Sequence, residues 1–394
     1  MGWYESRLEK LRNEMEKAHL NVLFLFKPQN TFYVSDFNAL IYSREVVAVI
    51  PLKAEPAIVI PRLRHSHALE ESKIRDVRVY HKIRVGELLP GMYQDPMRAL
   101  KQIVKDRKLS KLRIGIDLDY LSLVTYGEVR KTFPGAKLND VSKLIDGLRL
   151  IKDEEEIDRV RKASKLAAVG LEAEYDVIRK RGTEIEASVA GMNAMNNFWR
   201  DHYPTAEVAD FGGHEAGQIN GLQAFSLVGK RGLGSAESPS SQRYEEGEVA
   251  WQTNLTVYNG YHSELERTVC IGQPSSRVKQ GMEAHIEARE AVIEAMRPGA
   301  TMHEVAEVAA KIFRRTGYMK YIHARVGHSI GLGGHEGPSF MSGEKTVLEP
   351  GMIMTVEPAI ADPEVGSINH SDTVLVTKDK AERLTEAPSG LIVM

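Results

Sequence analysis

The spacing of apolar residues predicts a first domain in which helices and strands alternate. Leu8, Leu11 and Met15 recur at helical intervals within residues 5–18, which predicts an amphipathic helix there. A continuous apolar run at 22–26 follows and predicts a buried strand. The same patterns predict strands at 46–50, 57–60, 77–80 and 113–116, and a helix at 97–105. This alternation is typical of an α/β domain.

The pattern changes near residue 150, where a long helix is predicted to open a second domain. Asp153 is a typical N-cap, and the glutamates at 154–156 suit the positive end of a helix dipole. Further helices are predicted at 183–200, 278–296 and 302–315, with strands between them, and Gly317 marks the end of the last helix. We therefore predict two domains, residues 1–150 and residues 151–394, in a chain of mixed α/β class.

A weak internal repeat lies within the second domain. Residues 298–318 resemble residues 181–199 in their turn, their helix cap and their helical period. Each segment follows a long predicted helix and precedes glycine-rich strands. This resemblance favours a duplicated layout.

Composition narrows the class of protein. Apolar residues make up 42% of the 394 residues and charged residues 27%, which is typical of a globular protein of about two domains. The net charge of -2 offers no basic field for nucleic acid. The single cysteine, Cys270, excludes an intrachain disulfide and fits a reducing compartment. Because the amino end is charged and no apolar run approaches membrane length, we expect a cytoplasmic protein without a membrane partner.

The candidate chemistry lies in three short segments of the second domain. Residues 327–340 carry His328 and His335, residues 353–360 carry Glu357, and residues 260–268 carry Glu264 and Glu266. Histidines and carboxylates at glycine-rich segments can bind divalent ions, transfer protons or bind cationic substrates. Three further candidates, His262, His370 and the pair His214 and Glu215, are more simply interpreted as packed or solvated side chains.

These segments resemble successive motifs of the creatinase, prolidase and methionine aminopeptidase superfamily. The matching stretches are GYHSELERT at 260–268, GHSIGLGGHEGP at 327–338, LEPGMIMTVEPAI at 348–360 and HSDTVLV at 370–376. The resemblance implies a creatinase-like N-terminal α/β domain followed by a C-terminal pita-bread domain. It also implies a homodimer.

In the metal-dependent relatives, the resemblance implies five ligands for two divalent ions. Carried over to this chain, their positions are Thr253, Glu264, His328, Glu357 and Ser371. Hard divalent ions prefer anionic oxygens, and two of these five positions carry neutral hydroxyls. We therefore expect no metal and no other cofactor, with one ion held by Glu264, His328 and Glu357 as the open alternative.

The creatinase branch of the superfamily implies a different use of these residues. Glu266 and Glu357, with Glu264, would bind an amidine or guanidine group, because carboxylates form charge-assisted hydrogen bonds with planar cations. His328 and His335 would stabilise the developing tetrahedral centre. Glu237 takes the position of the creatinase catalytic histidine and is our candidate acid/base.

Arg44 occupies the position from which the creatinases bind the substrate carboxylate across the dimer. A charged residue at the edge of a strand is the alternative interpretation of Arg44. We thus predict a metal-independent, creatinase-like hydrolase that cleaves a C–N bond of a small, carboxylate-bearing molecule, such as a creatine-like or ectoine-like compound. A metal-dependent Xaa-Pro dipeptidase or aminopeptidase and a catalytically silent binding module are the alternatives.

Overall fold

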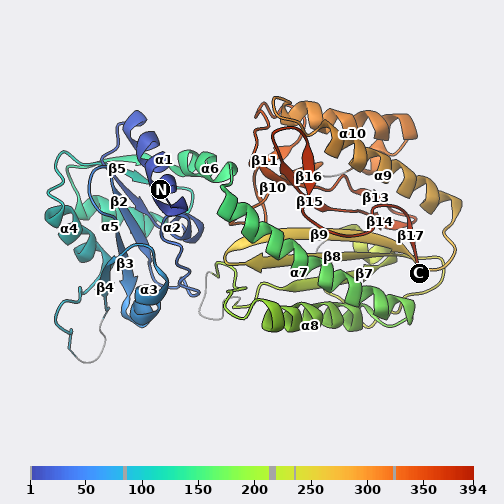
Figure 1. The fold of residues 1–394 in the computed structure, drawn as a ribbon, viewed down its shortest axis with the longest axis horizontal. Coiled ribbons are helices and arrows are strands. Elements are labelled where there is room, and N and C mark those ends of the chain that lie inside the picture. Colours follow the sequence, from blue (N-terminus) through green and yellow to red (C-terminus); the bar gives the residue numbers. More distant parts are fainter. Residues whose placement is uncertain (1, 83–86, 213–218, 235–236, 323–324) are drawn as a thin grey trace. The chain divides into compact units, whose positions relative to one another are not determined.

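The computed structural model describes residues 2–82, 87–212, 219–234, 237–322 and 325–394. The chain divides into two compact units, shown in Figure 1. The first unit comprises Met1–Arg149 with Asp210–Ile219, and the second comprises Leu150–Ala209 with Asn220–Met394.

The first unit is built on a mixed six-stranded sheet. Its strand order is β4-β3-β2-β1-β5-β6, antiparallel across the β3–β2 and β2–β1 pairs and parallel across the others. The strands are β1 (Val22–Leu25), β2 (Val47–Pro51), β3 (Ala57–Pro61), β4 (Asp76–Tyr80), β5 (Arg113–Ile116) and β6 (Lys137–Asp140). The helices are α1 (Trp3–Lys17), α2 (Pro28–Ser35), α3 (His65–Glu71), α4 (Pro96–Asp106), α5 (Leu123–Thr132) and α6 (Ser142–Leu150), with a short 3-10 turn η1 (Arg62–Arg64). The elements predicted from periodicity in this region are confirmed.

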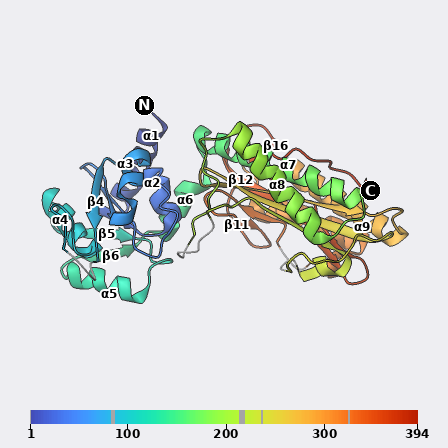
Figure 2. The same ribbon diagram turned by 90° about the horizontal axis from the view of Figure 1, so that it is seen from below.

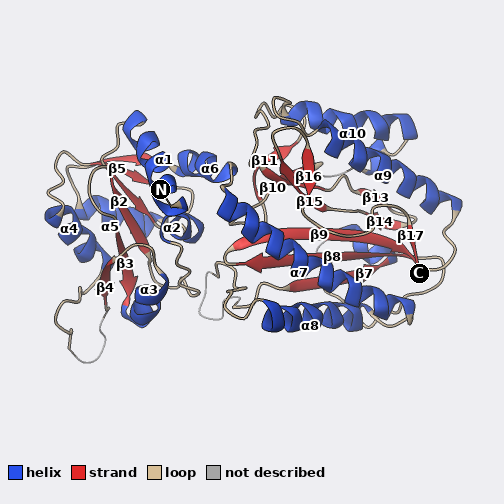
Figure 3. Ribbon diagram, in the orientation of Figure 1, coloured by secondary structure: helices blue, strands red, loops and turns tan. Residues whose placement is uncertain are grey.

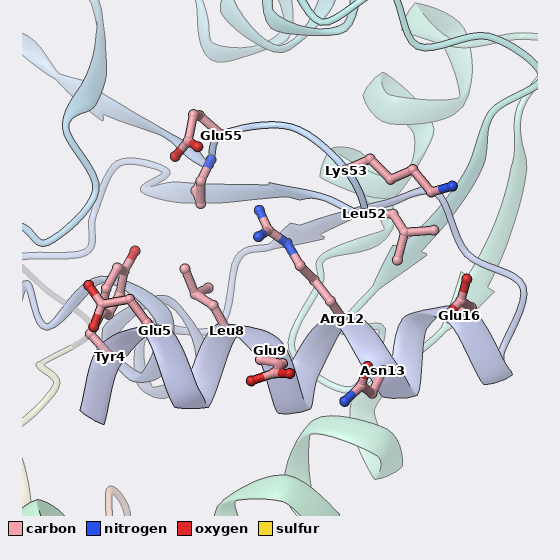
Figure 4. A pocket seen from close by; sticks show the side chains of 11 residues that line it. Tyr4, Glu5, Leu8, Glu9, Arg12, Asn13, Glu16, Leu52, Lys53 and Glu55 are labelled. Atoms are coloured by element: carbon pink, nitrogen blue, oxygen red, sulfur yellow. The ribbon is translucent and has the colours of Figure 1, made fainter. Parts of the chain in front are cut away.

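The apolar strands of this sheet form the core of the unit. Residues from β1, β2, β3 and β5 pack with α4 and α5 into one cluster, in which Phe24 contacts Phe133 with ring centroids 5.5 Å apart. A groove of about 650 Å³ runs between α1 and the β2–β3 turn, and Figure 4 shows Arg12 reaching across it. Arg12 donates hydrogen bonds to the carbonyl oxygens of Pro51 and Ala54, at 3.3 and 2.7 Å. This arginine therefore anchors the turn to the helix.

The second unit consists of helix pairs that pack on sheets. Its helices are α7 (Glu154–Arg179), α8 (Glu184–His202), α9 (Ser276–Ala295) and α10 (Met302–Thr316), with 3-10 turns η2 (Gly229–Gly234) and η3 (Met319–Tyr321). The strands are β7 (Gln223–Val228), β8 (Val249–Tyr258), β9 (Tyr261–Cys270), β10 (Gly327–Ser329), β11 (Glu336–Phe340), β12 (Ile353–Val356), β13 (Ile360–Asp362), β14 (Gly366–Ile368), β15 (Asp372–Val376), β16 (Ala381–Arg383) and β17 (Ile392–Val393). Figure 3 shows both kinds of element in each unit.

Two main sheets carry the residues of interest. One has the order β17-β9-β8-β7 and the other the order β11-β10-β12-β15-β16, while β13 and β14 form a separate ribbon. Helices α7 and α8 cover the first sheet, as Figure 2 shows, and α9 and α10 pack on the second. An isolated bridge between Glu266 and Ser371 joins β9 to the start of β15. Residues from both sheets therefore meet at this bridge.

The predicted helix caps are present in the second unit. Asp153 and Glu156 form a capping box at the start of α7, in which each side chain bonds the other residue's backbone N–H. Thr183 opens α8 and Thr301 opens α10 with the same arrangement, and α10 ends at Gly317 in the left-handed conformation. The two segments that resemble each other in sequence thus begin helices in the same way. Among the described residues, no helix combines the length and the apolar character needed to cross a bilayer.

Candidate active site

Strand β9 presents two buried carboxylates on one face. Glu264 and Glu266 are two residues apart, so their side chains leave the strand on the same side. Thr253 lies opposite Glu266 in β8, and its hydroxyl donates to Glu266 Oε1 at 3.1 Å. Asn369 donates to Oε2 of the same carboxylate. Each oxygen of Glu266 therefore accepts one hydrogen bond and keeps a second acceptor position.

The second sheet contributes His328 and Glu357. The backbone N–H of His328 donates to Thr355 Oγ1 at 3.0 Å, and its ring Nδ1 lies 2.9 Å from the carbonyl oxygen of Ser329. Because only a protonated ring nitrogen can donate to a carbonyl, Nδ1 carries the hydrogen and Nε2 is free to accept or to bind. Nε2 lies 3.3 Å from Glu357 Oε1 and 3.7 Å from Glu264 Oε2. Within the described part of the chain, Nε2 forms no hydrogen bond although it is fully buried.

Ser371 links the two sheets at the site. It exchanges two backbone hydrogen bonds of 3.1 Å with Glu266, and its hydroxyl donates to Glu264 Oε1 at 2.7 Å. The hydroxyls of Thr253 and Ser371 therefore act as donors to the carboxylates beside them. At positions 253 and 371 the family resemblance implies carboxylate ligands. In this chain both positions carry hydroxyls that donate hydrogen bonds to neighbouring carboxylates.

A buried ion network holds the backbone of this region. Arg267 donates to the carbonyl oxygens of Glu266 and Ser371, at 2.7 and 2.9 Å, and pairs with Asp372 at 2.7 Å. Arg289 lies 3.3 Å from the other oxygen of Asp372. These side chains are almost completely buried, so the network fixes β9 against β15 from behind the site.

The three carboxylates of the cluster differ in their electrostatics. Burial, and then the charge of Glu264, raise the pKa of Glu266 well above its ordinary value. Burial and the charges of Glu264 and Glu266 raise the pKa of Glu357 in the same way. Burial also opposes the ionised form of Glu264, but the neighbouring His328 ring, with the Ser371 hydroxyl, keeps its pKa below the ordinary value. Negative charge is thus concentrated on Glu264, next to His328.

His335 lies against His328. The two rings stack with centroids 4.3 Å apart and planes inclined by 27°, and His335 is exposed. Desolvation, together with the neighbouring His328, lowers the pKa of His335. A neutral imidazole in this position can donate a hydrogen bond to a substrate oxygen.

Two other predicted residues, Glu237 and Arg44, lie on other segments of the chain. Glu237 is half-exposed on the loop after η2 and pairs with Arg231 at 2.9 Å. Arg44 belongs to the first unit, at a recess of about 240 Å³ that Tyr42 and Tyr120 also line. The roles predicted for Glu237 and Arg44 stay predictions. His214 and Glu215 lie outside the described residues.

His262 and His370 are packed side chains. His262 Nδ1 lies 3.0 Å from the carbonyl oxygen of Gly331, and His370 Nε2 lies 3.1 Å from that of Thr268. This confirms the packed interpretation for both. Sequence reasoning missed Asn369, which holds Glu266, and Arg325, whose Nε lies 3.7 Å from Glu357 Oε1. Neither position carries a signal in the local pattern, since both contacts arise from the meeting of distant segments.

The donor set of this cluster fits a divalent cation. Ligand atoms of Glu264, Glu266 and Glu357 lie within 4.8 Å of one another, and so do those of Glu264, His328 and His335. Carboxylate oxygens and a neutral imidazole nitrogen are the donors that manganese, iron, cobalt and zinc accept. The buried Nε2 of His328 has no hydrogen-bond partner among the described residues and points to such an ion.

Comparison with known proteins gives the family. The profile of "Metallopeptidase family M24" matches residues 158–378, and that of the "Creatinase/Prolidase N-terminal domain" matches residues 7–151. The chain is 28% identical over 390 residues to the Xaa-Pro dipeptidase of Pyrococcus furiosus, covering 98% of this chain and all of that protein. It is 28% identical to the Xaa-Pro dipeptidase of Lactobacillus helveticus, covering 98% of each chain. The crystal structure of the prolidase from Thermococcus sibiricus has the same fold, with a TM-score of 0.82, 23% identity and full coverage of both chains.

The prediction of a metal-independent, creatinase-like hydrolase is wrong. The profile matched by the second domain is that of a metallopeptidase family, and similar proteins are Xaa-Pro dipeptidases. The prediction gave decisive weight to Thr253 and Ser371. It kept one ion held by Glu264, His328 and Glu357 only as an alternative, and these are the residues that the structure brings together around the buried Nε2 of His328. With a creatinase/prolidase N-terminal domain followed by a C-terminal pita-bread domain, this chain belongs to metallopeptidase family M24.

Proposed function

We propose that this protein is a metal-dependent peptidase that hydrolyses Xaa-Pro dipeptides. The observation that carries the proposal is the convergence of Glu264, Glu357 and the free Nε2 of His328 in one buried cluster. The Xaa-Pro dipeptidases to which the chain is similar along nearly its whole length support the substrate class.

In this proposal Glu264, His328 and Glu357 hold the cation. When bound, a divalent cation supplies Lewis-acid polarisation of the peptide carbonyl and stabilises developing negative charge. His335 donates a hydrogen bond to the same substrate oxygen from its exposed position on the His328 ring. The Arg267–Asp372 pair positions the carboxylates of β9 and takes no part in the reaction.

Binding of the dipeptide carboxylate is assigned to Arg44. A guanidinium offers parallel donors to a carboxylate, which suits the free end of a dipeptide. This proposal requires a homodimer in which Arg44 of each subunit binds the substrate carboxylate in the site of the other subunit. Glu237, which pairs with Arg231, is retained as a candidate for proton transfer. Glu237→Gln tests this role, because it removes the ionisable group and keeps the size of the side chain.

Hydrolysis of Ala-Pro before and after chelation tests the proposal. Proline release should stop after dialysis against a chelator and return when Mn²⁺, Co²⁺ or Zn²⁺ is added. His328→Ala should lower kcat by at least about 100-fold, since it removes a proposed ligand. His202→Gln, on the exposed end of α8, is the matched control and should keep full activity.

Three results would contradict the proposal. Full activity in the chelated protein would exclude metal dependence. Equal rates on Ala-Pro and Ala-Ala would exclude Xaa-Pro specificity. If no dipeptide were hydrolysed with any metal tested, the protein would be better explained as a catalytically silent binding protein of the same fold.

A further inference from the structure

We propose that this site binds one divalent cation per chain and not the pair that the superfamily pattern implies, with Glu266 as the additional carboxylate. The ligands are Glu264, Glu357 and His328, and Glu266 completes the set. The inference deepens the proposed function but concerns binding alone, so it stands or falls separately from Xaa-Pro hydrolysis.

Two of the five ligand positions, Thr253 and Ser371, carry hydroxyls that already donate hydrogen bonds to the carboxylates of the site. Ser371 donates to Glu264 Oε1 at 2.7 Å, and Thr253 donates to Glu266 Oε1 at 3.1 Å. A hydroxyl that donates to a carboxylate offers at most a neutral oxygen to a cation. Each hydroxyl also fills one of the acceptor positions of the carboxylate oxygen to which it donates. The free ligand atoms therefore point to one place.

That place is defined by His328. Its Nε2 is 3.7 Å from Glu264 Oε2, the oxygen that Ser371 leaves free, and 3.3 Å from Glu357 Oε1. The ring is fixed by the contact of Nδ1 with the Ser329 carbonyl oxygen, so Nε2 is aimed at these two oxygens. A buried nitrogen without a hydrogen bond among the described residues is the second observation, independent of the acidic cluster, that points to a bound ion.

The charges agree with a single ion. Carboxylates lose their protons when they bind a metal ion, so Glu264, Glu266 and Glu357 would together supply three negative charges to a bound cation. Arg325 adds a positive charge 3.7 Å from Glu357. Two divalent ions in this space would bring four positive charges and repel each other strongly in a buried site. One ion leaves the cluster close to neutral once Arg325 is included. Carboxylates at positions 253 and 371 would remove this imbalance.

Metal content gives a direct test. The full chain is dialysed against Mn²⁺, the free ion is removed, and bound manganese is measured by mass spectrometry and by electron paramagnetic resonance. We expect one equivalent with the spectrum of an isolated Mn²⁺ ion. Two equivalents with the spectrum of coupled ions, or no bound manganese, would overturn the inference.

Variants show which residues decide the number of ions. The double variant Thr253→Asp with Ser371→Glu should bind two equivalents and show the coupled spectrum. Ser342→Glu, an exposed hydroxyl changed in the same way, should still bind one. His328→Ala should bind none and Glu266→Gln should bind at least 10-fold more weakly, whereas His202→Gln should match the native chain. A double variant that folds, by circular dichroism, and still binds one ion would count against the inference.

The outcomes separate this inference from the proposed function. One bound ion without hydrolysis of Ala-Pro supports the single-ion site and contradicts the peptidase. Two bound ions with hydrolysis contradict the single-ion site and support the peptidase. Both measurements use the same native protein.

Discussion

His335 and His328 stack on each other, but only His328 has a buried nitrogen that faces the carboxylates of the cluster. We therefore expect His335→Ala to lower kcat/KM for Ala-Pro by about 100-fold, because a hydrogen-bond donor to the substrate is lost. The content of bound manganese should not change. Loss of the metal from this variant would instead identify His335 as a ligand.

His285 makes the second unit sensitive to acid. Burial, followed by the charge of Arg289, lowers the pKa of His285 to about 3. Its Nδ1 lies 2.9 Å from the Pro358 carbonyl oxygen, and Nε2 accepts from the backbone N–H of His370 at 2.9 Å. A proton on Nε2 would remove that acceptor. The folded state therefore resists protonation of this ring.

The sign of the effect follows from linkage. Between about pH 6.5 and the folded pKa of about 3, the unfolded chain binds a proton that the folded chain does not. Stability therefore falls with decreasing pH, by about 1.4 kcal/mol per pH unit for this one group. His285→Gln keeps an acceptor and does not titrate. Its free energy of unfolding, measured with urea, should therefore depend less steeply on pH than that of the native chain. Both chains are measured in buffer with chelator, so that no metal ion contributes. Equal slopes of the free energy of unfolding against pH would contradict the prediction.

At the scale of residues, sequence spacing locates Glu264, His328 and Glu357 but not their surroundings. Position along a motif identifies the side chain, whereas Asn369 and Arg325 reach the site through contacts between distant segments. The importance of the hydroxyls at 253 and 371 can be read from the sequence. Their consequence depends on which atoms they contact in the folded chain.

The β8–β9 hairpin shows how one element positions the site. Its turn consists of Asn259 and Gly260, with φ of 45° and 79°, a pairing of residues typical of a tight two-residue hairpin loop. Because Tyr258 pairs with Tyr261, the register brings Thr253 opposite Glu266. This contact could have been predicted from the Asn-Gly turn and the length of the two strands.

Gly260→Ala tests the importance of this turn. A residue with a Cβ at this φ costs about 1–2 kcal/mol, so we expect a matching fall in the free energy of unfolding and weaker manganese binding. Gly127→Ala, in the interior of α5 with no atom near the added Cβ, should stabilise the chain by about 0.5–1 kcal/mol. If Gly260→Ala changed neither the free energy of unfolding nor the affinity for manganese, the turn would not set the register of the two strands.

Among elements, long helices are predicted well and the short strands of the second sheet are not. Asp153, Thr183 and Thr301 mark helix starts locally, through capping boxes. Strand β10 has three residues, and its position depends on Gly327, whose missing side chain allows the Thr355 carbonyl to approach. Such close approach is a tertiary property that periodicity does not contain.

At the scale of the whole molecule, the change of unit falls where the helical pattern changes, near residue 150. The exception is the segment Asp210–Ile219, which belongs to the first unit although it lies within the sequence of the second. Phe211 packs on Phe32 with ring centroids 5.3 Å apart. A single long-range aromatic contact of this kind has no local signature, so the sequence pattern places the segment within residues 151–394.

The division into two units predicts where a bound ion stabilises the protein. The proposed ligands all lie in the second unit, so only its unfolding transition should respond to metal. At a Mn²⁺ concentration of about 100 Kd the linkage free energy is about 2.7 kcal/mol, which corresponds to a Tm increase of roughly 5–10 °C for a unit of this size. Calorimetry with Mn²⁺ or with chelator checks this, and His328→Ala should abolish the shift. A ligand stabilises only the folded structure to which it binds. An equal shift of both transitions would therefore contradict the prediction, because it would mean that the two units unfold together or that the ion binds elsewhere.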